Sequence, residues 1–161
     1  MNNNIVIKNV NSGHFNKPNV NIFIDLVYNH FIELANFVDL KHSKQEITRL
    51  LRSTNFRGYL VYNGSKIIGY LLGEIMILVD GRKVFYISYM FVAPSFRKKG
   101  IASQLMEYSR TLANNSRFDG VLLTVDSDNQ KVYEFYLKRG FMPDMTLRRY
   151  AQHEVLFQPL H

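Results

Sequence analysis

The chain has 161 residues, a length typical of one domain that buries about 70% of the surface of its unfolded chain. It contains no cysteine, which excludes disulfide bonds and a thiolate nucleophile and is typical of a reducing compartment such as the cytoplasm. The net charge of +7 favours an anionic ligand, nucleic acid or both as partners. No apolar stretch is long enough to span a bilayer, so we expect no membrane association.

The first half of the sequence predicts a strand, two helices and an antiparallel meander. In the second helix Ser43 and Glu46 have capping-box spacing, which marks its start. Asn63-Gly64 and Asp80-Gly81 each separate two apolar runs, as hairpin turns do. The ranges are a strand over 4–10, helices over 19–39 and 43–53, and three strands within 57–79 and 83–92.

The second half predicts alternating helices and strands. The run "GVLLTVDS" is apolar without interruption, as in a strand buried on both faces. Asn129 stands where a helix N-cap belongs, and Gly140 where that helix would stop. The ranges are a helix over 99–114, a strand over 120–127, a helix over 129–140 and a strand over 153–160. The fold class is therefore a mixed α/β sheet.

The segment "FVAPSFRKKGIA" places three cations, Arg97 to Lys99, at the start of the 99–114 helix. A helix N-terminus carries partial positive charge, so cations there need an anion between them. A pyrophosphate would bind the free N–H groups of the first turn, with Gly100 at its closest approach and the small Ala102 near the strand. The spacing excludes a P-loop, and one glycine cannot make a dinucleotide fingerprint.

This segment resembles the acetyl-CoA signature of the GNAT superfamily of N-acetyltransferases. Arg97, Gly100 and Ala102 match its fixed positions, and Val92 and Pro94 match its lead-in.

A second match, "NQKVYEFYLKRGF", lies downstream. Asn129, Tyr136, Gly140 and Phe141 fall on the family pattern, whereas Val132 replaces the common alanine, so the pantetheine arm would pack differently there.

The resemblance implies one GNAT-like domain over 1–161, with a mostly antiparallel sheet that contains two splayed parallel strands. It implies acetyl-CoA as donor, held between those strands. The cofactor-binding residues implied are Phe91, Val92, Arg97, Lys98, Lys99, Gly100, Ile101, Ala102, Asn129 and Tyr136. An amine acceptor would attack directly, with no acyl-enzyme and no metal.

The resemblance also implies that Tyr136 returns a proton to the departing thiolate, while Tyr133 is expected to pack. The general base stays open. Ser88 and Tyr89 stand where many relatives carry Glu, and neither is a good base at neutral pH. Glu74 either faces solvent or lies in a cleft with a raised pKa. A water chain ending at backbone carbonyls or at Tyr89 is the other candidate.

His30 and His42 are each expected to be a surface or helix residue, and the pairs Lys138-Arg139 and Arg148-Arg149 are expected to be solvated.

The sequence thus predicts an N-acetyltransferase with acetyl-CoA and an amine as partners, as a monomer or homodimer. The alternatives are an inactive module that binds acyl-CoA and, less favoured, a basic nucleic-acid binder. Nucleic-acid binding is disfavoured because the densest cation cluster lies inside the CoA motif.

Overall fold

The computed structural model describes residues 4–15, 19–34, 43–126, 129–147 and 153–160. Within these ranges the strands are β1 (Ile5–Asn11), β2 (Phe56–Asn63), β3 (Lys66–Ile77), β4 (Lys83–Val92), β5 (Gly120–Val125), β6 (Met142–Pro143) and β7 (Glu154–Pro159). The helices are α1 (Val20–Leu34), α2 (Lys44–Arg52), α3 (Ile101–Asn115) and α4 (Gln130–Leu137), with short 3-10 turns η1 (Ser12–Phe15) and η2 (Pro94–Phe96).

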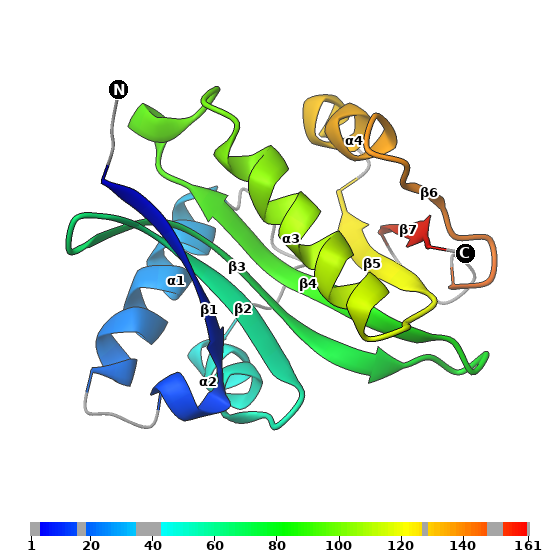
Figure 1. Cartoon of the computed structure of the whole chain (residues 1–161), viewed down its shortest axis with the longest axis horizontal. Helices are drawn as coiled ribbons and strands as arrows, with labels where there is room; N and C mark the ends of the chain where they lie inside the picture. Colours follow the sequence, from blue (N-terminus) through cyan, green and yellow to red (C-terminus); the bar gives the residue numbers. More distant parts are fainter. Residues whose placement is uncertain (1–3, 16–18, 35–42, 127–128, 148–152, 161) are drawn as a thin grey trace.

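The strands form one sheet in the order β1-β2-β3-β4-β5-β7-β6. All neighbouring pairs are antiparallel except β4 and β5, which are parallel. Helices α1 and α2 lie on one face and α3 and α4 on the other (Figure 1). The mixed α/β prediction and the splayed parallel pair are confirmed.

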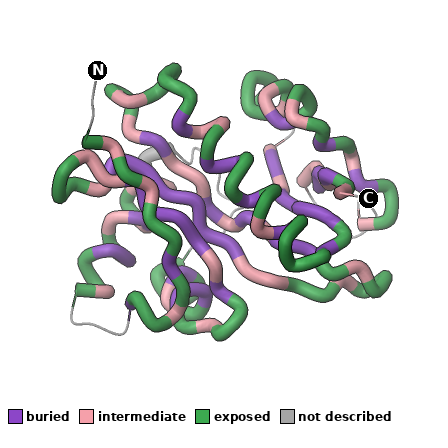
Figure 2. Tube along the Cα trace, viewed as in Figure 1, coloured by how far each residue is buried: buried purple, intermediate pink, exposed green. Residues whose placement is uncertain are grey.

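Each face of the sheet has its own core. Leu71, Phe85 and Leu123 pack under α3 and α4, and Phe56, Leu60 and Tyr70 pack under α1 and α2. Burial follows the central strands and fades at the outer ends of the helices (Figure 2). Strand β5 is buried on both faces, as its unbroken apolar run predicts.

Most predicted boundaries hold within a few residues. Ser43 caps α2 and accepts a hydrogen bond from the Glu46 backbone N–H at 3.1 Å. Helix α1 begins at Val20, and the predicted helical residues 35–39 lie outside the described part of the chain. Strand β6 and the two 3-10 turns were not predicted, because two to four residues carry no periodicity.

An ion pair ties the segment after β6 to the loop between β3 and β4. Arg82 Nη1 lies 2.6 Å from Asp144 Oδ2, and only 4% of the Asp144 side chain is exposed. Burial by itself raises the pKa of Asp144, but the Arg82 guanidinium and the Leu147 backbone N–H outweigh burial, so this pKa lies below its usual value.

Candidate active site

Strands β4 and β5 separate partway along their length. Their parallel register runs from Val84↔Gly120 to Ile87↔Leu123, while β4 continues to Val92 without a β5 partner. Just beyond Ile87, β4 contains a β-bulge at Ser88. Leu72 of β3 pairs with Tyr89 and Gly73 pairs with Ile87, which leaves Ser88 without a partner residue on β3. Such bulges redirect side chains and are common beside active sites.

A cavity of about 180 Å³ opens where the two strands part. Residues from both faces of the sheet line this cavity, among them Phe31 of α1, Ser88 and Tyr89 of β4, and Tyr136 of α4. The opening therefore connects the side covered by α1 and α2 with the side covered by α3 and α4. Two reactants that approach from opposite faces could meet at this point.

The loop before α3 turns sharply through two positive φ angles. Gly100 has φ +83° and Lys98 has φ +61°, a conformation that costs a non-glycine residue about 1–2 kcal/mol. Arg97 stabilises the turn, because its Nε donates to the Val92 carbonyl at 2.8 Å and its guanidinium lies 5.9 Å from the centre of the Phe91 ring. Lys98 and Lys99 are exposed.

This loop has the shape that a pyrophosphate requires. A Cβ built on Gly100 would meet no protein atom within 4 Å, so the backbone there faces open space. Gly100 is also the N-cap of α3, so the N–H groups of Ile101 and Ala102 belong to a first turn that has no intrahelical acceptors. These residues line a cavity of about 260 Å³ with Val92 and Arg97. The residues present fit the phosphate end of CoA.

Tyr136 brings a buried hydroxyl to the opening between the strands. Its side chain is 7% exposed, and its ring packs edge-on against Phe135 and Phe141. Burial raises the pKa of Tyr136 to about 12, so the hydroxyl stays protonated at neutral pH, as a proton donor must. Tyr133 is half-buried and packs beside the core under α3 and α4.

Asn129 caps α4 and lines the same opening as Tyr136. Its side-chain oxygen accepts a hydrogen bond from the Val132 backbone N–H at 3.3 Å, as the N-cap prediction requires. Asn129 is exposed, so its amide nitrogen can also reach a ligand.

Glu74 lines a cavity, is mostly buried and forms an ion pair with Arg49. Its side chain is 13% exposed, and Arg49 of α2 donates to its carboxylate at 3.0 and 3.4 Å. Glu74 and Arg49 line a cavity of about 320 Å³ that shares Ser88 and Tyr89 with the opening between the strands. The sequence did not point to Arg49, because an arginine on an amphipathic helix is usually solvated.

Tyr89 is poorly suited to accept a proton. It is 4% exposed, and burial raises its pKa to about 12, so its hydroxyl is neutral at physiological pH. Its ring lies edge-on to Phe31.

His30 lies on helix α1, in agreement with its prediction as a surface or helix residue. It is half-buried, its Nδ1 lies 2.9 Å from the Tyr70 hydroxyl, and its ring stacks on Phe91 with 3.7 Å between centroids. The predictions for His42 and for Arg148-Arg149 lie outside the described residues.

The described residues thus bring together a loop with an open helix N-terminus, a split sheet and a buried tyrosine. The Acetyltransferase (GNAT) family model matches residues 24–141. The chain belongs to this family.

Solved structures support the same fold. The NatC complex bound to Gag peptide and CoA aligns with TM-score 0.73 and 18% identity over 98% of this chain and 99% of that one. An acetyltransferase from Streptococcus agalactiae gives TM-score 0.73 and 16% identity over the same shares. An aminoglycoside acetyltransferase from a soil metagenome, in complex with sisomicin, aligns with TM-score 0.64 and 18% identity over 84% of this chain and 87% of that one. No curated protein matches the sequence.

None of the described helices is long and apolar enough to cross a membrane.

Proposed function

We propose that this protein transfers the acetyl group of acetyl-CoA to a primary amine by direct attack of the amine. The observation that carries the proposal is the opening at the end of the β4–β5 pairing, which joins the Gly100 side of the sheet to the cavity at Glu74. Structures of relatives hold reactants of this kind: Arabidopsis thaliana Naa50 binds the bisubstrate analogue CoA-Ac-MVNAL.

On the donor side, the Gly100 loop binds the pyrophosphate with the N–H groups of the α3 first turn, and Lys98 and Lys99 offset its charge. The pantetheine arm extends along β4 beyond Ile87, beside Phe91 and Val92. The Val92 carbonyl already accepts from Arg97, which holds the end of this strand against the loop. The thioester supplies an acyl carbon that an amine can attack.

In the transfer itself, the amine nitrogen bonds to the acetyl carbon and the carbon–sulfur bond breaks. An alkylammonium has a pKa of about 10.4, so the acceptor must lose a proton before attack. Glu74 receives this proton, directly or through water, from the cavity it lines with Arg49. Tyr136 donates its hydroxyl proton to the thiolate and regains a proton from solvent.

The test is turnover of acetyl-CoA with a panel of amines: free amino acids, short peptides with free N-termini, lysine-containing peptides and aminoglycosides. Release of free thiol is measured together with the mass of the acetylated product. We expect one class to react well above the hydrolysis background. CoA binding by calorimetry without turnover of any amine would support an inactive CoA-binding module instead.

A further inference from the structure

The cavity at Glu74 lies on the α2 side of the sheet and adjoins the opening between β4 and β5. Its volume of about 320 Å³ is within the range of small-molecule sites. Four of its lining residues are apolar or aromatic: Leu50 of α2, Met76 of β3, and Tyr86 and Tyr89 of β4. The cavity therefore suits a small molecule or a side chain with an apolar stem.

The rest of the lining carries an ordered network of charges. Arg49 lies between two carboxylates, because its Nε donates to Glu46 at 3.2 and 3.3 Å and its two Nη atoms donate to Glu74 at 3.4 and 3.0 Å. The Glu74 side chain is 13% exposed, whereas those of Glu46 and Arg49 are about half exposed. The charge of Glu74 is therefore the least screened by solvent of the three.

The cavity has a net negative charge in a chain whose net charge is +7. Among its described lining residues, the carboxylates of Glu46 and Glu74 outnumber the one guanidinium of Arg49. The adjoining opening adds the carboxylate of Asp126 and no cation from the described residues. A cation is therefore attracted to this side of the sheet, and an anionic group is repelled.

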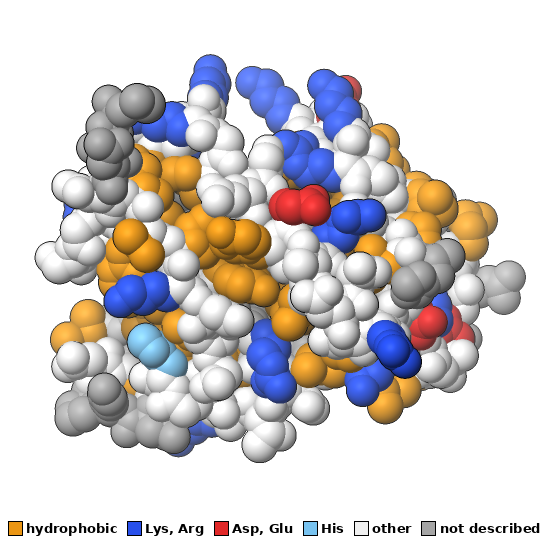
Figure 3. Space-filling view, viewed as in Figure 1, with side chains coloured by type: hydrophobic (Ala, Val, Ile, Leu, Met, Phe, Trp, Pro, Cys, Tyr) orange, Lys and Arg blue, Asp and Glu red, His pale blue; other side chains and the backbone are white. Residues whose placement is uncertain are grey.

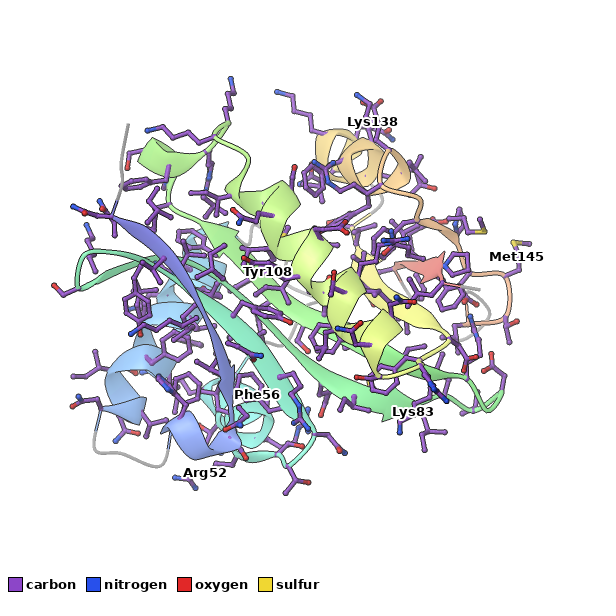
Figure 4. The ribbon with its side chains drawn as sticks, in the orientation of Figure 1. Arg52, Phe56, Lys83, Tyr108, Lys138 and Met145 are labelled. Atoms are coloured by element: carbon purple, nitrogen blue, oxygen red, sulfur yellow. The ribbon has the colours of Figure 1, made fainter. Side chains whose placement is uncertain are left out.

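Cations gather on the opposite side of the sheet. Lys and Arg side chains follow the upper edge of the face that α3 and α4 cover (Figure 3). Lys138 at the end of α4 is exposed (Figure 4), whereas Arg139 is half-buried and its Nη1 donates to the Phe135 carbonyl at 2.9 Å. Arg139 thus corrects the expectation of a solvated Lys138-Arg139 pair. The two sides of the opening differ in charge, as an anionic donor and a cationic acceptor would require.

We infer that the acceptor is a cationic primary amine on an apolar stem, with no carboxylate beside the amine, and that Glu46 and Arg49 determine this selectivity. The inference rests on the proposed function, since it takes the acceptor to enter through this cavity. The ammonium group approaches Glu74, and the stem lies against Tyr86 and Tyr89. A carboxylate on the next carbon would face two like charges and one opposite charge, so free amino acids are poor acceptors.

The test compares phenethylamine with phenylalanine, which has the same stem and an added carboxylate. Acetylation of each is measured as kcat/KM at saturating acetyl-CoA in wild type, Glu46→Gln and Arg49→Gln. We expect wild type to favour phenethylamine at least tenfold. This preference should fall about threefold in Glu46→Gln, which loses a negative charge, and rise about threefold in Arg49→Gln, which loses the positive charge. Both changes should appear mainly in KM.

The ratio of the two acceptors separates a charge effect from a structural one. A structural defect lowers kcat/KM for both acceptors and leaves their ratio unchanged, and the intrinsic reactivities of the two amines cancel when variants are compared. Glu107→Gln is the matched control, because Glu107 also pairs with an arginine three residues later but lies on α3. Its ratio should equal that of wild type. Glutamine at position 46 also preserves the capping box with Ser43.

The outcomes separate the inference from the proposed function. Equal acetylation of both probes by wild type, or one ratio shared by wild type, Glu46→Gln and Arg49→Gln, would overturn the inference. Reaction of another amine of the panel while both probes stay inert would overturn it too, while acetyl transfer stands. If no amine reacts, both fail. Thermal melting checks that each variant is folded, and Glu46→Gln, at a half-exposed position, carries the test if Arg49→Gln is not.

Discussion

Replacement of Gly100 by valine tests the phosphate loop most directly, because the structure separates two effects of the change. One effect is backbone strain, since Gly100 has φ +83° and an L-residue there costs about 1–2 kcal/mol. The other is steric, because the new side chain would project into the open space that the pyrophosphate requires.

Gly81 is a matched control. It has φ +93°, a Cβ built on it also meets no atom within 4 Å, and it lies in the β3–β4 hairpin away from the loop. Gly100→Val and Gly81→Val should therefore lose similar stability. At about 2–4 °C per kcal/mol for a chain of this size, each melting temperature should fall by about 2–8 °C.

Only Gly100→Val should lose affinity for acetyl-CoA. We expect at least a tenfold weakening, which is about 1.4 kcal/mol, while Gly81→Val binds as wild type does. Isothermal titration calorimetry gives the affinities and thermal melting gives the stabilities. A folded Gly100→Val protein with unchanged affinity would mean that the pyrophosphate binds elsewhere.

Three further predictions follow from the site and the fold. Tyr136→Phe should lower kcat about ten- to a hundredfold with little change in KM for acetyl-CoA, whereas Tyr133→Phe should resemble wild type; full activity in the first variant would leave water as the proton donor. Affinity for acetyl-CoA should fall as salt rises if residues 97–99 bind phosphate, and a flat dependence in calorimetry would make them a solvated surface. Asp144→Asn should lower the free energy of unfolding by about 1–2 kcal/mol, because it removes the charge of the buried partner of Arg82 while Asp80 still pairs with this guanidinium at 2.7 Å.

The Asp144 carboxylate also gives a pH dependence. Its folded pKa lies below its ordinary value of 3.8, so its stabilising contribution is present above that pH and is lost as the pH falls through the folded pKa. Acid denaturation of wild type should therefore begin in this range, and Asp144→Asn should show a flatter profile there. Equal pH profiles of wild type and Asp144→Asn by circular dichroism would mean that the Arg82–Asp144 pair does not determine stability in acid.

Local patterns in the sequence were sufficient to predict most of the fold. Gly64 and Gly81 both adopt positive φ in the turns that Asn63-Gly64 and Asp80-Gly81 predict, and Asn129 caps α4 as expected. These features depend on neighbouring residues alone, so one sequence suffices to find them.

The candidate site was less accessible to sequence reasoning, because it depends on contacts between distant residues. Arg49 reaches Glu74 across 25 positions, and His30 reaches Tyr70 across 40. Neither pair leaves a periodic signal, since only the packing of α1 and α2 on the sheet brings its members together. The motif residues Gly100 and Tyr136 could be found because their spacing is local and the family resemblance supplied their roles.

Because β4 and β5 pair over only a few residues, the last strand of the chain is important to the opening between them. The family match stops at residue 141, yet β7 follows it and pairs with β5 along the full length of that strand, from Gly120↔Pro159 to Val125↔Glu154. On its other side β5 pairs with β4 through only four residues. Removal of residues 154–161 would remove β7 and leave β5 as an unpaired edge strand. Unpaired edge strands are known templates for aggregation. A truncation designed from the family boundary would thus cut away the support of the strand that it aims to keep.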